Sequence, residues 1–162
     1  SQGNLDIAFK QPFYLKGRQY YTDAINITNG SDWLRNFTTN LHDYQLHTVT
    51  HPPFITLLHY GILKLVNGSV LSLGIVFFLL SSLFFLVLNK IFDYLGFSLE
   101  RKKILLLLSA IIPAVNIYLL VSIDGLILAT SSLVLLGIAR MLSKKKVDFF
   151  SFLYCFFGFL NL

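Results

Sequence analysis

The chain has 162 residues, 55% of them hydrophobic, and carries a formal net charge of +5. Soluble domains hold about 45–50% apolar residues, and the excess here lies after residue 53, which argues for an integral membrane protein rather than a large soluble core. The basic residues flank apolar segments, so their charge indicates membrane orientation and not a nucleic-acid partner. The single cysteine forms no disulfide framework. Because the sequence starts without methionine and stops inside an apolar run, we expect it to be part of a longer chain.

Residues 1–52 are polar and mixed in composition, and two stretches within them predict short helices. These stretches are QYYTDAINI (19–27) and SDWLRNFTTNLHDY (31–44). Ser31 or Asp32 is expected to cap the second helix, because short polar side chains accept hydrogen bonds from the first helical N–H groups.

The stretch LHTVTHPPF (46–54) joins this polar part to the first apolar segment. Pro52 disfavours helical backbone at His51, so we expect HTVT to be extended, with His47 and His51 about 13 Å apart on one side. That separation is too long for one metal ion, and we therefore predict no metal site and no cofactor. We interpret both histidines as polar groups that hydrogen-bond an anionic ligand; zinc or another divalent ion is the weaker alternative. Pro52 and Pro53 are suited to start the next helix.

The segment FITLLHYGILKLV (54–66) is too short to cross a membrane. As a helix it would measure about 20 Å, against the roughly 30 Å of a bilayer core. Its polar residues fall at i, i+3, i+4 and i+8 and line one side (Thr56, His59, Tyr60 and Lys64). This pattern predicts a helix that lies in the membrane interface.

Four further apolar segments follow, and we predict a membrane span for each. Pro113 lies inside the second span, where we expect a tolerated kink. The spans are residues 69–88, 104–123, 125–142 and 147–162, the last cut short by the end of the sequence.

The basic residues orient these spans. Lys and Arg gather in or beside loops 89–103 and 143–147, which therefore face the cytoplasm under the positive-inside rule. Residues 1–66 and the turn at Asp124 are then external. The predicted fold class is an all-α integral membrane protein, in which an external loop with juxtamembrane helices precedes a polytopic helical bundle (67–162).

Two acids on the external side are candidate catalytic groups. Asp124 sits between two apolar segments, where a carboxylate usually faces a cavity or a partner; capping of the following helix is a compatible alternative. Asp23, in YYTDA, is either a solvated surface acid or part of a carboxylate pair that binds a cation or activates a hydroxyl. Asp6 and Asp43 are weaker rivals.

The order of these parts resembles the GT-C superfamily, the polytopic membrane glycosyltransferases that use polyprenyl-phosphate sugars. The resemblance is carried by WLRNFTTNLHDYQLHTVTHPPF, a short helix ending in NG, and spans with an external Asp124. Protein mannosyltransferases and the lipid A aminoarabinose transferase belong to this superfamily. The LRxF…H…HPP run looks most like bacterial members, which read HxxxHPPG, whereas Phe54 replaces the glycine here. The resemblance covers nearly the whole sequence and corresponds to the first third of such an enzyme, without its first span.

The resemblance implies an inverting transfer of a sugar from a lipid-linked donor to a hydroxyl of a glycan, lipid or protein acceptor. The reaction would occur at the outer face of a prokaryotic plasma membrane, in contact with membrane lipids. Asp23 is the candidate for the general base of the first external loop, with Asp6, nearer the missing first span, as the alternative. Asp124 matches the acid that opens the second loop. The candidate substrate-binding residues are His51, beside the donor phosphate, and His47, Arg35 and Tyr21.

Two other readings stay open. One is a non-enzymatic polytopic membrane protein, such as a transporter or a lipid-binding subunit, and the other is a truncated or inactive enzyme. A transporter is expected to bury acids in mid-span near broken helices, whereas the charges here stay at the span boundaries. That distribution favours the enzyme, although these 162 residues alone are not expected to be active.

Overall fold

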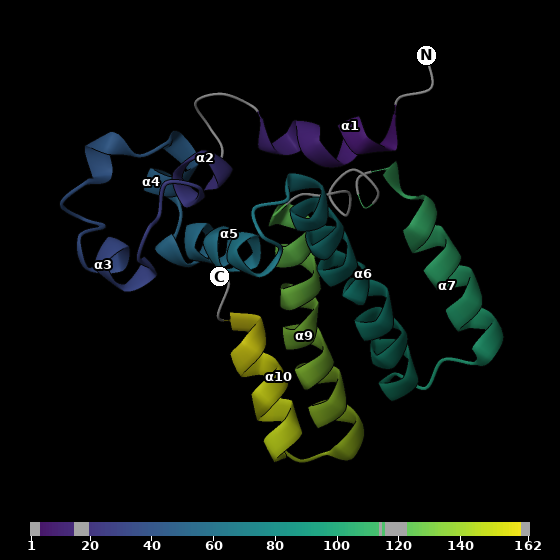
Figure 1. Cartoon of the computed structure of the whole chain (residues 1–162). Coiled ribbons are helices and arrows are strands. Elements are labelled where there is room, and N and C mark those ends of the chain that lie inside the picture. Colours follow the sequence, from purple (N-terminus) through teal and green to yellow (C-terminus); the bar gives the residue numbers. More distant parts are fainter. Residues whose placement is uncertain (1–3, 15–19, 114, 116–122, 160–162) are drawn as a thin grey trace. The chain divides into compact units, whose positions relative to one another are not determined.

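The computed structural model describes residues 4–14, 20–113, 115 and 123–159 (Figure 1). Their regular secondary structure is entirely helical, so the all-α prediction is confirmed for this described part of the chain. The chain divides into two compact units, residues 1–76 and residues 77–162.

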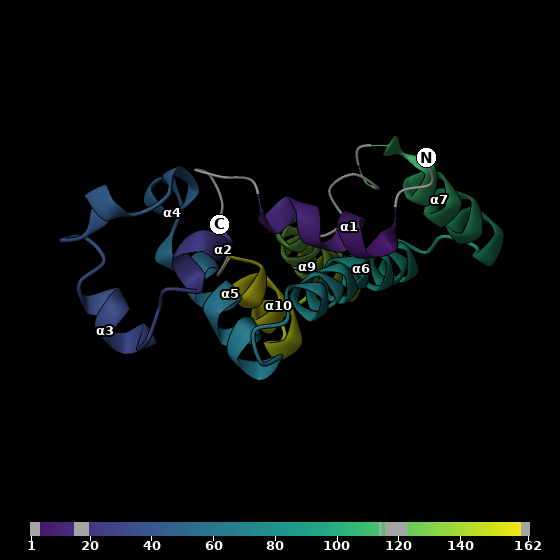
Figure 2. The same cartoon turned by 45° about the horizontal axis from the view of Figure 1, so that its top comes forward.

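In the first unit, short helices pack on the longer helix α5. Figure 2 shows α2 beside α5, and α3 and α4 also contact α5. The buried side chains between them include Ala24 and Ile62, and the buried hydroxyls of Thr48 and Thr56 lie 3.3 Å apart. The elements are α1 (Leu5–Lys10), η1 (Gln11–Phe13), α2 (Tyr20–Ala24), α3 (Gly30–Arg35), η2 (Leu41–Asp43), α4 (Leu46–Thr50) and α5 (Pro53–Leu65).

The predicted helix over 31–44 is wrong in its length and in its cap. Helix α3 ends at Arg35, and Asn36 follows with its side-chain amide donating to the Asp32 carbonyl at 3.0 Å. The run NFTTN is rich in residues whose side chains compete for backbone hydrogen bonds. The cap is Asn29, whose Oδ1 accepts from the Ser31 N–H at 2.9 Å and the Asp32 N–H at 3.4 Å.

The expectation of an extended HTVT segment is also wrong. Residues Leu46–Thr50 form helix α4, and the His51 N–H donates to the His47 carbonyl at 3.2 Å. His51 itself is extended, at φ −123° and ψ 162°. Proline restricts only the residue directly before it, so one helical turn fits between Gln45 and His51.

Helix α5 runs from Pro53 to Leu65, so the predicted helix over 54–66 is confirmed with its bounds one residue earlier. Of the four polar residues predicted to line one side of this helix, Thr56 and His59 are buried against the rest of the unit, whereas Lys64 is exposed. On the opposite side, Phe54 is 47% and Leu65 is 84% exposed. Apolar side chains of α5 therefore lie on both sides of the helix, with Ile55, Ile62 and Leu63 buried and Phe54 and Leu65 uncovered by the unit.

The second unit is made of long helices that begin with the later part of α6. Helices α6 and α9 are each long and apolar enough to cross a membrane. The predicted spans 69–88 and 125–142 correspond to these two helices, whereas 147–162 corresponds to an apolar helix of 11 residues, α10. The helices are α6 (Val70–Tyr94), α7 (Leu99–Ile111), α9 (Ile123–Lys144) and α10 (Phe149–Phe159).

Helix α6 extends beyond the predicted end of its span, residue 88, and stops at a glycine. Gly96 has a φ of +73°, which only glycine adopts without strain. Its N–H donates to the Asp93 carbonyl, the Phe97 N–H donates to the Phe92 carbonyl, and the two phenylalanine rings stack 5.5 Å apart. This is a Schellman ending with its apolar contact.

The predicted span 104–123 is not one continuous helix. Helix α7 stops at Ile111, and Ile112 is extended at φ −64° and ψ 119°. Pro113 excludes helical backbone at the residue before it, so it ends the helix rather than kinking it. Residues 114 and 116–122 of that predicted span lie outside the described residues.

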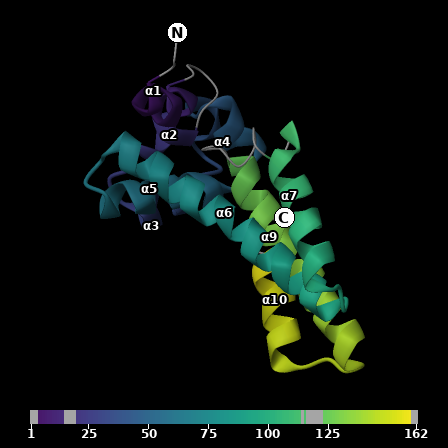
Figure 3. The same ribbon diagram turned by 90° about the vertical axis from the view of Figure 1, so that its right-hand side faces the viewer.

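Helices α9 and α10 lie side by side in Figure 1 and Figure 3. Glycines allow this close packing. A Cβ at Gly137 would lie 2.9 Å from the Ser151 carbonyl oxygen, and one at Gly158 would lie 2.9 Å from the Thr130 carbonyl oxygen. Small residues at such contacts are typical of helix pairs in membranes.

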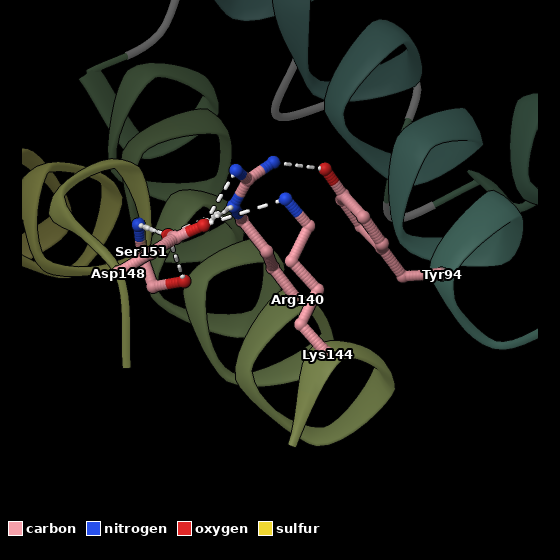
Figure 4. A network of polar contacts seen from close by, with 5 residues as sticks. All are labelled: Tyr94, Arg140, Lys144, Asp148 and Ser151. Atoms are coloured by element: carbon pink, nitrogen blue, oxygen red, sulfur yellow. Dashed lines mark hydrogen bonds and ion pairs between the residues drawn. The ribbon is translucent and has the colours of Figure 1, made fainter. Parts of the chain in front are cut away.

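A polar network fixes the turn between α9 and α10 (Figure 4). The Arg140 guanidinium donates to both Asp148 oxygens, at 3.0 and 2.7 Å, and to the Tyr94 hydroxyl on α6. Asp148 also accepts from the backbone N–H and the hydroxyl of Ser151, at 2.9 and 2.8 Å. Asp148 therefore caps α10 and holds Arg140 against it.

Candidate functional site

The first unit gathers its candidate residues around one face of helix α2. Tyr20, Asp23 and Ala24 are all buried and fall at i, i+3 and i+4. Residues with that spacing lie on the same helical face. Tyr21 is one residue further round the helix and lies on a different face.

The Asp23 carboxylate is 7% exposed and held in place. Its Oδ2 accepts from the Gln45 backbone N–H at 2.9 Å, which fixes the short helix to the chain just before α4. Asp23 also lines a cavity of about 220 Å³ together with Asn26, Trp33, Asp43 and Tyr44. A fixed carboxylate at the wall of a small cavity is suited to accept a proton from a bound hydroxyl.

Three histidines surround the Tyr20 ring. Its centroid lies 5.5 Å from those of His47 and His59 and 5.8 Å from that of His51. The rings of His47 and His51 are 5.7 Å apart, which corrects the expected 13 Å spacing of their side chains, because α4 is helical. Within the described residues, no group of three histidine, cysteine or acidic side chains is arranged to hold a metal ion.

His59 is the buried member of this cluster. Its Nδ1 donates to the Ile55 carbonyl at 2.8 Å, and the ring is 4% exposed. Burial lowers the pKa of His59 from 6.5 to about 4, against a smaller opposing effect of the Ile55 carbonyl. His59 is therefore neutral at pH 7, with its ring hydrogen on Nδ1.

His51 is the exposed member, and its ring orientation is set by local hydrogen bonds. The Thr50 hydroxyl donates to the Leu46 carbonyl at 2.9 Å, so the Thr50 oxygen accepts from His51 Nδ1 at 3.1 Å. The His47 carbonyl lies 3.1 Å from the same nitrogen. These contacts engage Nδ1, so Nε2 is the ring nitrogen on the other side of the imidazole.

Three sequence candidates lie apart from this cluster. Arg35 is exposed in the last turn of α3. Tyr21 packs against Phe13 and Tyr14, with centroids 5.9 and 6.0 Å away; burial, and then Tyr14, raise the pKa of Tyr21. Asp6, the rival first-loop acid, forms an ion pair with its helical neighbour Lys10 at 2.8 Å.

Asp124 lies in the first turn of α9 and belongs to the second unit. It is part of the helix rather than the residue before it, and acids in the first turn favour helix formation. It lines a cavity of about 450 Å³ with Ile127, Leu128 and Ser131. A joint role for Asp23 and Asp124 stays a prediction.

Sequence reasoning missed several residues of this region. Tyr20 and His59 were not chosen, although the i, i+3, i+4 spacing of Tyr20 with Asp23 was a usable signal. A mostly apolar cavity of about 320 Å³, lined by Ile27, Leu63 and Lys64 among others, was also missed. This cavity lies where the turn between α2 and α3 packs against the end of α5. The spacing of residues in the sequence does not predict that contact.

Comparisons with protein-family models, with curated proteins and with solved structures give no match to this chain.

Proposed function

We propose that the chain is part of an integral membrane glycosyltransferase that uses a polyprenyl-phosphate sugar as donor. The observation that carries the proposal is the buried Asp23 carboxylate, held by the Gln45 N–H at the wall of a small cavity. Asp23 is the general base, which takes the proton of the acceptor hydroxyl while the anomeric carbon develops positive charge. Inversion follows from a single displacement at that carbon.

The proposed donor site uses the histidines and the apolar cavity. His51 and His47 are the polar groups for the departing phosphate, since protonated imidazoles form charge-assisted hydrogen bonds with phosphate oxygens. The apolar cavity beside Leu63 suits part of the isoprenoid chain of the donor.

The proposed membrane location is supported by the two long apolar helices α6 and α9. It is also supported by the exposed apolar side of α5, which is joined to α6 by a short turn at Asn67 and Gly68. We assign α5 to the membrane surface and residues 1–66 to the external face of a prokaryotic plasma membrane, in a multi-pass protein.

The test measures sugar transfer by the full-length gene product in membrane vesicles, with a radiolabelled polyprenyl-phosphate sugar. Asp23→Asn is expected to lower kcat by about 10²- to 10⁴-fold, the usual contribution of a general base. Asp6→Asn is the matched control, because Asp6 is the rival acid and is paired with Lys10. A wild-type rate in Asp23→Asn contradicts the assignment of the base.

A second variant separates donor binding from proton transfer. His51→Gln keeps a polar side chain but removes the cationic form, so it is expected to raise the KM for the lipid donor more than it lowers kcat. His42→Gln is its control, because His42 is exposed and contacts only Asp43 among the described ion pairs. Equal effects of the two variants contradict a phosphate role for His51.

A further inference from the structure

We propose that the loop around α3 carries a two-part groove for a saccharide, and that this saccharide is the acceptor substrate. The term acceptor rests on the proposed function, whereas the binding is argued from the groove alone. The groove consists of the 220 Å³ cavity beside Asp23 and an adjoining cavity of about 160 Å³. The two cavities share three lining residues, Asn26, Trp33 and Tyr44.

The size of the two cavities limits the ligand. Each is smaller than the roughly 300–1,000 Å³ typical of pockets for drug-sized molecules. Two small compartments that meet at a shared wall suit two small rings in sequence better than one large flat ligand. A disaccharide, or the two terminal rings of a longer glycan, has this shape.

The shared wall is aromatic. The centroids of Trp33 and Tyr44 lie 5.4 Å apart, and Phe37 stacks against Tyr44 at 5.6 Å. A sugar ring has an apolar face of C–H groups, which packs on an aromatic ring while the hydroxyls point outward. Trp33 and Tyr44 line both compartments and so contribute aromatic surface to each.

The polar lining is rich in hydrogen-bond acceptors. Asn26 donates its amide N–H to the Thr22 carbonyl at 2.8 Å, and Asn36 donates to the Asp32 carbonyl at 3.0 Å. These bonds orient both amides and leave the Oδ1 atoms as acceptors for a ligand. Carboxylates add further acceptors, and such a lining matches a ligand that carries many hydroxyl donors.

The charge of the groove excludes an anionic ligand. Asp23 and Asp43 line one compartment and Asp32 lines the other, while none of the lining residues described for either compartment is lysine, arginine or histidine. Like charges repel a phosphate. The groove therefore selects a neutral sugar or an amino sugar, and a hydroxyl bound in the first compartment lies beside Asp23.

The single tryptophan of the chain, Trp33, gives a direct readout of this groove. The experiment titrates the chain in detergent micelles with methyl mannoside, a mannose disaccharide, glucosamine, mannose 1-phosphate and calcium chloride, and follows tryptophan fluorescence. We expect saturable changes with the neutral and amino sugars, and at least about tenfold tighter binding of the disaccharide, which corresponds to about 1.4 kcal/mol. Mannose 1-phosphate is expected to bind at least about tenfold more weakly than methyl mannoside.

Two variants test the compartments while Trp33 stays in place. Asn40 lines only the second cavity, so Asn40→Ala is expected to abolish the advantage of the disaccharide and to keep the Kd of the monosaccharide. Thr39→Ala, at an exposed neighbour outside both cavities, is expected to bind like the parent. Circular dichroism checks that each variant keeps its helix content.

Several results would overturn the groove. They are no response to any saccharide by the folded chain, tighter binding of mannose 1-phosphate than of methyl mannoside, or a response to calcium alone. Loss of the disaccharide advantage in Thr39→Ala as well would also overturn it. Saccharide binding by a protein that transfers no sugar refutes the proposed function and keeps the groove, whereas transfer without binding refutes only the groove.

Discussion

His59 makes the first unit sensitive to acid, and the size of the effect follows from its burial. The pKa of His59 is about 4 in the folded chain, against 6.5 when the ring is exposed to water. As the pH falls, the unfolded state therefore binds a proton first. The neutral ring stabilises the fold fully above pH 6.5, and this contribution is lost as the pH falls from 6.5 toward 4.

The expected loss is a substantial fraction of the roughly 5–15 kcal/mol that stabilises a typical domain. Between pH 7 and pH 5, these two pKa values give a decrease in the free energy of unfolding of about 2 kcal/mol, and the complete shift corresponds to about 3 kcal/mol. The ring has to leave its place against Tyr20 or carry an unfavourable buried charge. The Tyr20 cluster is thus expected to loosen below pH 6.

The assay is chemical unfolding in a mild detergent at pH 7 and pH 5, followed by circular dichroism. His59→Gln removes the titrating ring, so the difference between its two unfolding free energies is expected to be about 2 kcal/mol smaller than in the parent. His42→Gln is the control, because the His42 side chain is 77% exposed. Equal pH differences in parent and His59→Gln, or an NMR titration of His59 near 6.5, refute the reasoning.

Three further predictions concern the helices, each read as a change in thermal unfolding temperature. Gly158→Ala places a Cβ 2.9 Å from the Thr130 carbonyl oxygen and is expected to destabilise the fold by about 1–3 kcal/mol. Its control, Gly61→Ala, has open space around the new Cβ and is expected to stabilise the fold by about 0.5–1 kcal/mol. Equal effects of the two variants contradict the close packing of α9 and α10. Gly96→Ala forces a residue with a Cβ to a φ of +73° and is expected to cost about 1 kcal/mol; no change contradicts the Schellman ending. Asp148→Asn removes the charge that pairs with Arg140 and is expected to lower the unfolding temperature more than Lys144→Gln, because Lys144 is the exposed partner at 3.4 Å. The reverse order contradicts the role of Asp148 in holding Arg140.

Much of the helical framework was predictable, because long apolar runs and proline signals are local properties of the sequence. The start of α5 at Pro53 and the long apolar helices α6 and α9 follow from such signals. The differences lie at the prolines. Pro52 restricts only His51, so a helical turn fits before it, and Pro113 ends α7 at Ile111 instead of kinking one continuous helix.

The candidate site was predictable only in part, because its geometry depends on contacts between distant segments. Asp23 was chosen from its neighbourhood in the sequence, but its contact with the Gln45 N–H joins residues 22 positions apart. Tyr20 among the histidines and Trp33 against Tyr44 are likewise long-range contacts. Arg35 and Tyr21 were chosen from the same runs, and the structure gives them other surroundings.

The polar side of α5 links the candidate site to the proposed membrane surface. Thr56 and His59 face the interior of the first unit, and the Tyr60 hydroxyl donates to the Thr28 carbonyl at 3.2 Å. Because these polar groups bond within the unit, the opposite side of the helix needs no water, and its apolar side chains can lie in lipid. In the proposed arrangement, one helix would hold the histidine cluster on one side and contact the bilayer on the other.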